Sequence, residues 1–329
     1  MGGKALKQKG FDTVRLSTDE LENKYHQVKT VFERYGIITH NVNFYTNKQT
    51  HGDLDVLVNI TPNTRVSFEQ IIKENFTSKC ILRNGAVVSF ELDNFQVDLI
   101  PVSHKNWGVA KTFFDYDPTG NLMGKVAHRF GLKYGFCGLV YPFRNFNGRN
   151  SVDITVSLDN AQIFDFLGYS YEKYNKGFKS LEDVFEYIIN GRYFNNQIFD
   201  FEKLTHTDRK RNLRRDTYQQ FLKYIKENDT KSNFVFNTKD SYFDYIDSFF
   251  PEAKLKETFQ KLKQEDDLNK VCAEKFNGHI IMNNFPELYG RELGDAITLF
   301  KKSLPNYKEF ILTHTEDEIL EHFTKIYQS

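Results

Sequence analysis

The stretch of sequence that decides the fold is His51-Gly52-Asp53-Leu54-Asp55-Val56-Leu57-Val58. Its apolar end predicts a β-strand that enters a hydrophobic core. Because side chains in a strand alternate between two faces, Asp53 and Asp55 point to the same face and Leu54 to the other. A second apolar run, Phe95-Gln96-Val97-Asp98-Leu99-Ile100, carries one more aspartate near its middle and predicts a second strand.

The three aspartates, Asp53, Asp55 and Asp98, allow two interpretations. Each segment alone is compatible with a turn or an edge strand whose carboxylate is solvated. Three carboxylates buried together, however, are costly unless a cation neutralises them. One or two Mg²⁺ ions commonly do so, in sites that carry out phosphoryl or nucleotidyl transfer. Asp98 favours the metal-binding interpretation, because a lone carboxylate is rarely tolerated inside an apolar run.

The composition limits the class of protein. The 329 residues suffice for two or three domains, and 44 basic residues balance 44 acidic ones, so the chain as a whole is not a strongly basic nucleic-acid binder. Aromatic residues make up 16%, which suits an aromatic core or surfaces on which bases stack. With no signal peptide or long apolar run, we expect a cytoplasmic protein without membrane association. The sequence does not determine the oligomeric state.

The first 145 residues alternate between helix and strand signals. Capping boxes at 17–20 and 67–70 predict helices that end near Tyr35 and Phe76. Strands are expected at 37–45, over the Asp53 segment, and as a hairpin of 86–92 and 95–102 that turns at Asp93-Asn94. A helix at 121–130 and a strand at 134–141 follow. This order predicts an α+β fold with a small mixed β-sheet and helices.

Beyond residue 145 the pattern becomes mostly helical. Helices are expected at 180–189 and 205–226, and a last one opens at the capping box 315–318. Polar stretches at 145–150 and 228–233 are candidate boundaries. The sequence therefore predicts three parts: a mixed-sheet domain at 1–145, a helical middle domain with a basic helix at 146–230, and a C-terminal helical domain at 231–329.

The D-h-D strand and the separate h-D-h strand, where h is hydrophobic, resemble the nucleotidyltransferase superfamily of DNA polymerase beta, poly(A) polymerases and CCA-adding enzymes. The resemblance covers roughly residues 1–145, and the chain looks most like phage-encoded members, which begin Met-Gly-Gly. It implies that residues 1–145 form the catalytic domain and that Asp53 and Asp55 ligate two Mg²⁺ ions, with Mn²⁺ as a substitute. Asp98 would ligate the catalytic ion and help to activate the attacking hydroxyl. It also implies ATP or another NTP as substrate and, for a phage protein, the host cytoplasm as location.

The chain departs from that family at the glycine loop, which normally lies shortly before the aspartate pair. The window 41–48 has no glycine, and Gly2-Gly3-Lys4 holds the only Gly-Gly in the chain. These residues either bind nucleotide phosphates through backbone N–H groups and the lysine charge, or form a flexible N-terminus. His51, Gly52 and Lys105 are further nucleotide-binding candidates, with a turn or a solvated loop as the alternative.

The densest basic run lies in the helix expected at 205–226. It offers five candidates for contacts with phosphate or nucleic acid: Arg209, Lys210, Arg211, Arg214 and Arg215. Like charges four residues apart on a helix repel, so an anionic ligand or an acidic partner such as Glu182-Asp183 is expected opposite them. Asp115 and Asp117 also alternate, but the Pro118-Thr119-Gly120 that follows favours a turn.

Together these features predict a metal-dependent nucleotidyltransferase. It would transfer a nucleoside monophosphate from an NTP to a hydroxyl and release pyrophosphate, with a tRNA-like RNA 3′ end as the favoured acceptor. Two alternatives stay open. One is a toxin-like or second-messenger enzyme that modifies a protein or small molecule, and the other is an inert nucleic-acid-binding protein.

Overall fold

The computed structural model describes residues 4–62, 64, 66–148, 151–213, 215–232 and 234–328. The chain forms two compact units, one of Met1–Pro142 with Thr155–Ala253 and the other of Phe143–Ile154 with Lys254–Ser329. The division into three domains expected from the sequence stays a prediction, which limited proteolysis would test.

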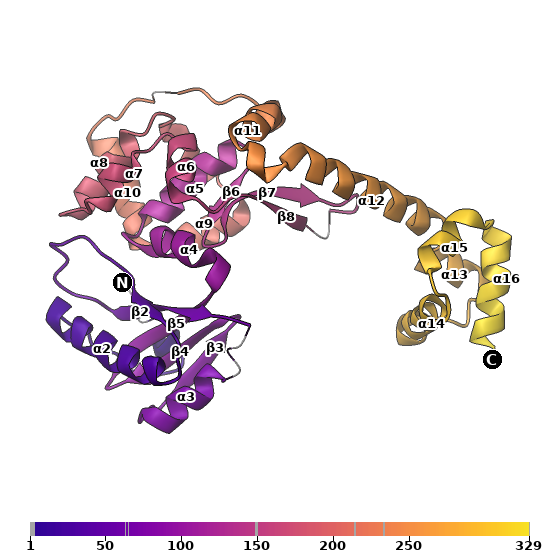
Figure 1. Ribbon diagram of the computed structural model, residues 1–329, viewed down its shortest axis with the longest axis horizontal. Coiled ribbons are helices and arrows are strands. Elements are labelled where there is room, and N and C mark those ends of the chain that lie inside the picture. Colours follow the sequence, from indigo (N-terminus) through magenta and orange to yellow (C-terminus); the bar gives the residue numbers. More distant parts are fainter. Residues whose placement is uncertain are drawn as a thin grey trace. The chain divides into compact units, whose positions relative to one another are not determined.

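A mixed five-stranded sheet forms the centre of the N-terminal part (Figure 1). Its spatial order is β1 (Thr39–Asn41), β2 (Asp53–Ile60), β5 (Phe95–Ser103), β4 (Val87–Leu92) and β3 (Ile81–Asn84). The β2–β5 pair is parallel and the other pairs are antiparallel. The predicted hairpin is confirmed, because β4 and β5 are joined at Asp93 and Asn94, whose φ angles of 51° and 59° suit a tight turn.

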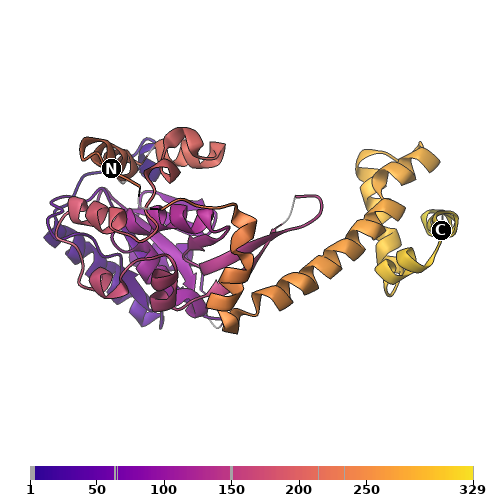
Figure 2. The ribbon, with the colours of Figure 1, turned by 90° about the horizontal axis from the view of Figure 1, so that it is seen from above.

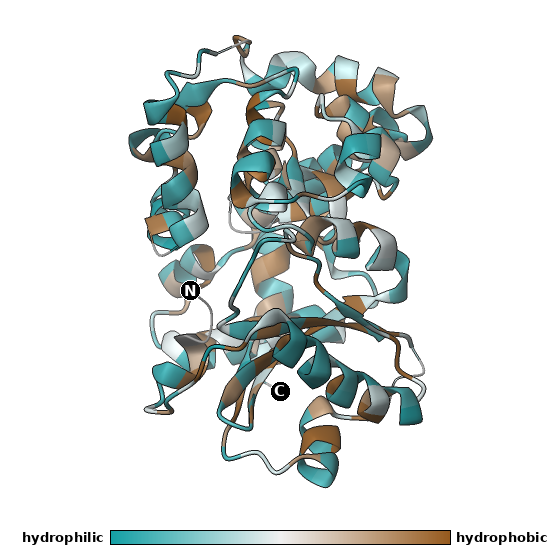
Figure 3. Ribbon diagram, turned by 90° about the vertical axis from the view of Figure 1, so that its left-hand side faces the viewer, coloured by the Kyte–Doolittle hydropathy of each residue, from teal (hydrophilic) through white to brown (hydrophobic). Residues whose placement is uncertain are grey.

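One face of this sheet is covered by α2 (Thr18–Arg34) and α3 (Phe68–Asn75), which lie on the same side in Figure 1. Ser17 and Glu20 form the predicted capping box of α2, whereas the Ser67 hydroxyl makes no capping bond and donates instead to Glu69. The core between sheet and helices includes Phe32, Ile72, Val56, Phe90 and Val97. In Figure 3, hydrophobic residues (brown) and hydrophilic residues (teal) alternate along these strands and helices.

The opposite face of the sheet packs against α4 (Trp107–Phe114), where Leu57, Val102 and Ala110 form a smaller apolar cluster. The strand expected at 37–45 is short, because the chain after β1 is held by Asp115, which accepts hydrogen bonds from the Asn43 backbone N–H and side-chain amide (2.8 and 2.9 Å). The expected helix at 121–130 is α5 (Thr119–Arg129).

The chain then forms a three-stranded sheet before it becomes helical. Its strands are β6 (Lys133–Gly135), β7 (Gly138–Arg144) and β8 (Ser151–Ser157), in that order. The single strand expected at 134–141 is therefore divided between β6 and β7, and β8 is a strand that the sequence pattern does not predict. The helices that follow are α6 (Asn160–Phe166), α7 (Tyr171–Asn175), α8 (Leu181–Ile189), α9 (His206–Leu213), α10 (Asp216–Glu227) and α11 (Phe243–Phe249).

The prediction of one long basic helix over 205–226 is wrong. Helix α9 ends at Leu213, and Arg215 has extended backbone angles (φ −101°, ψ 104°) as the residue before α10. Arg211 and Arg215 are therefore not one turn apart on a continuous helix. The break places Asp216 in the first turn of α10, where an acidic side chain is favourable.

The C-terminal unit is largely helical. It contains α12 (Leu255–Lys275), a single long helix in Figure 2, followed by α13 (Gly278–Asn284), α14 (Gly290–Ser303), α15 (Tyr307–Thr313) and α16 (Glu316–Tyr327). These helices share a core that includes Ile281, Phe300 and Phe323. The predicted capping box at Thr315 and Glu318 is confirmed. Within the described part of the chain, no helix is both long and apolar enough to cross a membrane.

Candidate active site

The three predicted aspartates lie together on the sheet. Asp55 of β2 and Asp98 of β5 are register partners across the parallel strand pair, and Asp53 lies two residues before Asp55 on the same face. Because Leu54 and Val97 point into the core under α2 and α3, alternation directs the aspartates to the opposite face. The clustering expected from the sequence is therefore present.

Burial and nearby carboxylates disfavour the charged forms of Asp55 and Asp98. Burial, followed by the charges of Asp53, Asp98 and Asp117, raises the pKa of Asp55 well above its usual value. Burial and the nearby Asp53 raise the pKa of Asp98 to about 6, against the lowering effect of hydrogen bonds from Ser89 and Gln96. A bound cation would relieve this electrostatic strain.

Asp98 is held by a buried glutamine that also reaches the N-terminal segment. The Gln96 side-chain amide donates to both oxygens of Asp98 (3.1 and 2.9 Å), and its Oε1 accepts from the backbone N–H of Leu6 (3.1 Å). Gln96 is only 2% exposed. Helix α1 (Lys4–Lys7) is thus fixed next to the aspartates, although it lies far from them in sequence.

A cavity of about 860 Å³ opens over Asp53 and Asp55. Among the described residues, four cationic side chains also line it: Arg15, Lys48, Arg211 and Arg215. The basic run therefore contributes two arginines to the same cavity as the aspartates. Acidic and basic groups that line one cavity suit a ligand that carries phosphates together with metal ions.

Lys48 lines the cavity, although no pattern in the sequence marks it as a site residue. Its ammonium group lies 5.7 and 6.0 Å from the ring centroids of Phe44 and Tyr45. Burial lowers its pKa, while the charges of Asp53, Asp117 and Asp55 act in the opposite direction. Its loop is anchored by the Thr46 and Asn47 backbone N–H groups, which donate to the carbonyls of Phe178 and Lys179 (3.0 and 2.9 Å).

Arg215 is a partly buried cation, and nearby carboxylates offset only part of the cost of its burial. Burial and the charge of Arg211 lower its pKa, and Asp117 and Asp208 oppose this effect. Asp208 itself forms an ion pair with Lys125 (3.0 Å). Two guanidinium groups that repel each other at a cavity wall form a favourable place for an anion.

Asp117 also lines the cavity, although the sequence favoured a plain turn around it. Its Oδ2 accepts a hydrogen bond from the Thr217 hydroxyl (3.1 Å), which connects it to the start of α10. Asp115 instead has a structural role, since it accepts hydrogen bonds from His40 (3.0 Å) and Asn43. The alternation of the two aspartates gave a signal, but nothing in the sequence said which of them faces a cavity.

The other nucleotide-binding candidates occupy different environments. His51 is 2% exposed, lines the cavity and packs against Phe44 with the two rings tilted (centroids 4.3 Å apart). Burial and the charges of Lys48 and Arg15 lower its pKa to about 4. The ring of His51 is therefore neutral near pH 7. Gly52 is buried beside His51, whereas Lys105 is exposed on a short 3₁₀ turn and does not line the cavity.

Several candidates cannot be placed at the cavity. Gly2, Gly3 and Arg214 lie outside the described residues, as does the side chain of Lys4. Arg209 and Lys210 are on α9 but do not line the cavity, and Arg209 lies 3.4 Å from a carboxylate oxygen of Glu202. Their proposed contacts with phosphate stay predictions.

The donor set of the three aspartates fits a hard divalent cation, because Mg²⁺ prefers carboxylate oxygens. Burial and neighbouring carboxylates raise the pKa values of Asp55 and Asp98, and a bound divalent cation would oppose this effect. As the side chains lie, however, no three His, Cys, Asp or Glu residues of the described chain are arranged to hold one metal ion. Metal binding would therefore require the carboxylates to reorient.

Comparisons with known proteins give little further guidance. No protein-family model and no curated protein matches the chain. Among solved structures, the chain is similar to a Leishmania infantum polymerase beta crystallised as a ternary P/T complex. The similarity has 13% sequence identity and a TM-score of 0.38, and it covers 48% of this chain and 74% of that one. Nothing in these comparisons supports a phage origin.

Proposed function

We propose that this protein is a metal-dependent nucleotidyltransferase, which transfers a nucleoside monophosphate from an NTP to a hydroxyl and releases pyrophosphate. The observation that carries the proposal is the pairing of Asp55 with Asp98 on adjacent parallel strands, with Asp53 on the same face. Arg211 and Arg215 line the same cavity as Asp53 and Asp55, so carboxylate and guanidinium side chains lie at one site.

Asp53, Asp55 and Asp98 would hold two Mg²⁺ ions, for which Mn²⁺ can substitute. Bound there, the ions would supply Lewis acidity for the acceptor hydroxyl and neutralise the charge of the triphosphate. The protein's own contribution is to gather three carboxylates on a rigid sheet. Gln96 and Ser89 donate hydrogen bonds to Asp98, so its carboxylate has partners when no metal ion is bound.

The triphosphate would be bound by Lys48, Arg211 and Arg215. Each is a cation at the wall of the cavity that Asp53 and Asp55 line, and burial lowers the pKa of both Lys48 and Arg215. An anion between them would offset both their desolvation and their mutual repulsion. These side chains would do the work that a glycine loop before the aspartate pair does in the family that the sequence resembles.

An RNA 3′ end is the acceptor that we favour. The exposed Lys210 is on the same helix as Arg211 but does not line the cavity, so it is free to contact a strand that enters there. A protein or small-molecule acceptor would use the same chemistry. The neutral overall charge of the chain leaves this second acceptor class open.

Incubation with each α-labelled NTP, Mg²⁺ and total RNA tests the proposal. We expect wild-type protein to transfer label to RNA and the Asp53→Asn/Asp55→Asn variant to transfer none. Lys111→Ala, at a partly exposed position of α4 that does not line the cavity, is the control and should keep full activity. Label on protein or in a small product would change the acceptor but keep the chemistry. No transfer and no NTP binding would refute the proposal and favour an inert binding protein.

A further inference from the structure

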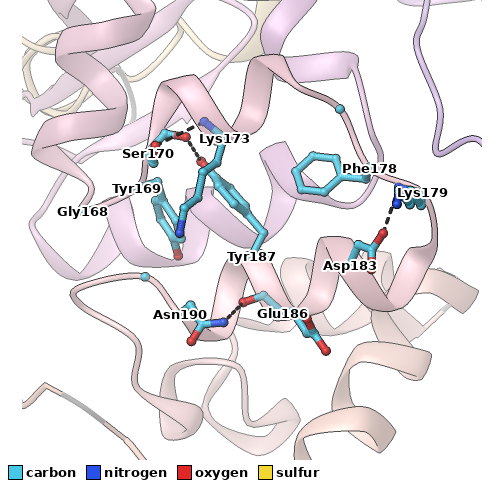
Figure 4. A pocket seen from close by; sticks show the side chains of 12 residues that line it. Gly168, Tyr169, Ser170, Lys173, Phe178, Lys179, Asp183, Glu186, Tyr187 and Asn190 are labelled. Atoms are coloured by element: carbon cyan, nitrogen blue, oxygen red, sulfur yellow. Dashed lines mark hydrogen bonds between the residues drawn. The ribbon is translucent and has the colours of Figure 1, made fainter.

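A second cavity, of about 600 Å³, lies among the helices that follow β8 (Figure 4). The residues that matter for its chemistry are Tyr169, Lys173, Phe178, Lys179, Tyr187 and Asn190. It shares no lining residue with the cavity over the aspartates. Its volume falls in the range of roughly 300–1,000 Å³ that is typical of small-molecule sites.

The cavity contains a buried hydroxyl without a partner. Tyr169 is 6% exposed, and its hydroxyl forms no hydrogen bond within the described chain. Burial raises its pKa, so the group is a neutral O–H donor at any physiological pH. The neighbouring Tyr187 differs, because its hydroxyl donates to the Ser170 carbonyl (3.0 Å). A ligand atom that accepts from Tyr169 would satisfy a group whose isolation is costly.

The two tyrosines also provide an aromatic wall. The rings of Tyr169 and Tyr187 are stacked, with centroids 5.5 Å apart and an interplanar angle of 29°. Phe178 packs against Tyr187 at the other side, with ring centroids 5.3 Å apart. Such a wall favours a flat, weakly polar ring over a sugar or a simple ion.

The acidic groups at the rim of the cavity have hydrogen-bond partners, whereas the lysine ammonium groups have no ion-pair partner among the described residues. Asp183 accepts hydrogen bonds from the backbone N–H groups of Lys179 and Ser180 (2.9 and 3.1 Å), and Glu186 is hydrogen-bonded to Tyr224. The ammonium groups of Lys173 and Lys179 form no ion pair with any residue that the structure describes. The rim therefore offers positive charge to a ligand. Figure 4 shows the Tyr169 and Lys173 side chains running in the same direction across the cavity, toward Asn190.

We infer that this cavity binds a nucleotide unit, with its base against Tyr169 and Tyr187 and its phosphate near Lys173 and Lys179. The Tyr169 hydroxyl would donate to an acceptor atom of the base. The unit is either a free nucleotide or one residue of a nucleic-acid strand, since both present the same ring and phosphate. This inference does not depend on nucleotidyl transfer at the aspartates.

Binding of AMP to the full chain in EDTA tests this site, in an Arg211→Ala/Arg215→Ala background that silences the other cavity. We expect Tyr169→Phe to weaken binding roughly 5- to 10-fold, as for one lost hydrogen bond. Lys173→Ala/Lys179→Ala should weaken it at least about tenfold, through lost charge-assisted contacts. Lys176→Ala, on the same stretch but paired with Glu172 (2.6 Å), should have no effect.

The source of the nucleotide follows from a comparison of AMP with a short oligoadenylate. Tighter binding of the oligonucleotide, lost in the same variants, would assign a strand, and equal binding would assign the free nucleotide. Two results would overturn the inference: AMP binding that ignores all three substitutions, or ribose 5-phosphate binding as tightly as AMP. Because both lysines are exposed, their variants test the site even if Tyr169→Phe impairs folding.

Discussion

Replacing Asp98 with asparagine should stabilise the protein when no metal is present. The asparagine side chain keeps an oxygen that can accept from Gln96 and Ser89, but it removes the negative charge next to Asp53 and Asp55. The substitution therefore separates the electrostatic cost of the aspartate cluster from its hydrogen bonding.

The magnitude follows from the pKa of Asp98. Burial and the charge of Asp53 raise it from 3.8 to about 6. At about 1.36 kcal/mol per pKa unit, this shift corresponds to a cost of up to about 3 kcal/mol once the group is ionised. Because the folded state binds the proton more tightly than the unfolded state, this cost is absent below about pH 4 and develops as pH rises to about 6.

Urea unfolding in EDTA, followed by the fluorescence of Trp107, measures this effect. Trp107 is the only tryptophan of the chain and packs against the sheet face that carries the aspartates. We expect Asp98→Asn to exceed wild type in free energy of unfolding by about 1–3 kcal/mol at pH 7.5 and to equal it near pH 4. Asp12→Asn, an exposed position, should match wild type at both values.

A destabilised Asp98→Asn variant at pH 7.5 would refute this reasoning, as would a difference from wild type that does not change with pH. Added Mg²⁺ gives a further check. A ligand that binds only the folded state stabilises it, so Mg²⁺ should raise the stability of wild type more than that of the variant.

Three other tests, on Lys48, Arg215 and Gln96, examine the remaining parts of the site. Lys48→Met should raise the KM for NTP about tenfold or more with a smaller change in kcat, because it removes a charge-assisted contact to the triphosphate; steady-state kinetics measure this. Arg215→Ala should weaken NTP binding about tenfold or more and make it less dependent on salt concentration, because it removes a charged contact in the cavity. Lys210→Ala, outside the cavity, should leave NTP binding unchanged. Equal losses in both variants would contradict the placement of the triphosphate in the cavity. Gln96→Ala should lower Mg²⁺ affinity by about 10- to 100-fold in calorimetry, since residues that orient metal ligands typically have effects of that size, and unchanged affinity would show that Gln96 only fastens α1.

The parts of the fold that follow from local patterns could be predicted. Strict alternation placed Asp53 and Asp55 on one face, and the structure pairs Asp55 with Asp98 across parallel strands. The capping boxes at Ser17 and Thr315 and the turn at Asp93-Asn94 are likewise local signals, set by a few neighbouring residues.

The features that the sequence did not reveal depend on contacts between distant segments. Lys48 is one lysine among many in the sequence, and its place in the cavity comes from the hydrogen bonds of its loop to Phe178 and Lys179. Asp117 lines the cavity together with Thr217, which lies a hundred residues further along the chain and donates a hydrogen bond to its carboxylate. The break between α9 and α10 at Arg215 could have been suspected from like-charge repulsion, but periodicity alone continued the helix.

The central claim is tested most directly by the phosphorus product that the protein releases from an NTP. With Mg²⁺ and the acceptor present, wild type should release pyrophosphate in a one-to-one ratio with transferred nucleoside monophosphate, and Asp53→Asn/Asp55→Asn should release none. Orthophosphate in place of pyrophosphate, or equal pyrophosphate release from the double variant, would contradict nucleotidyl transfer at these aspartates.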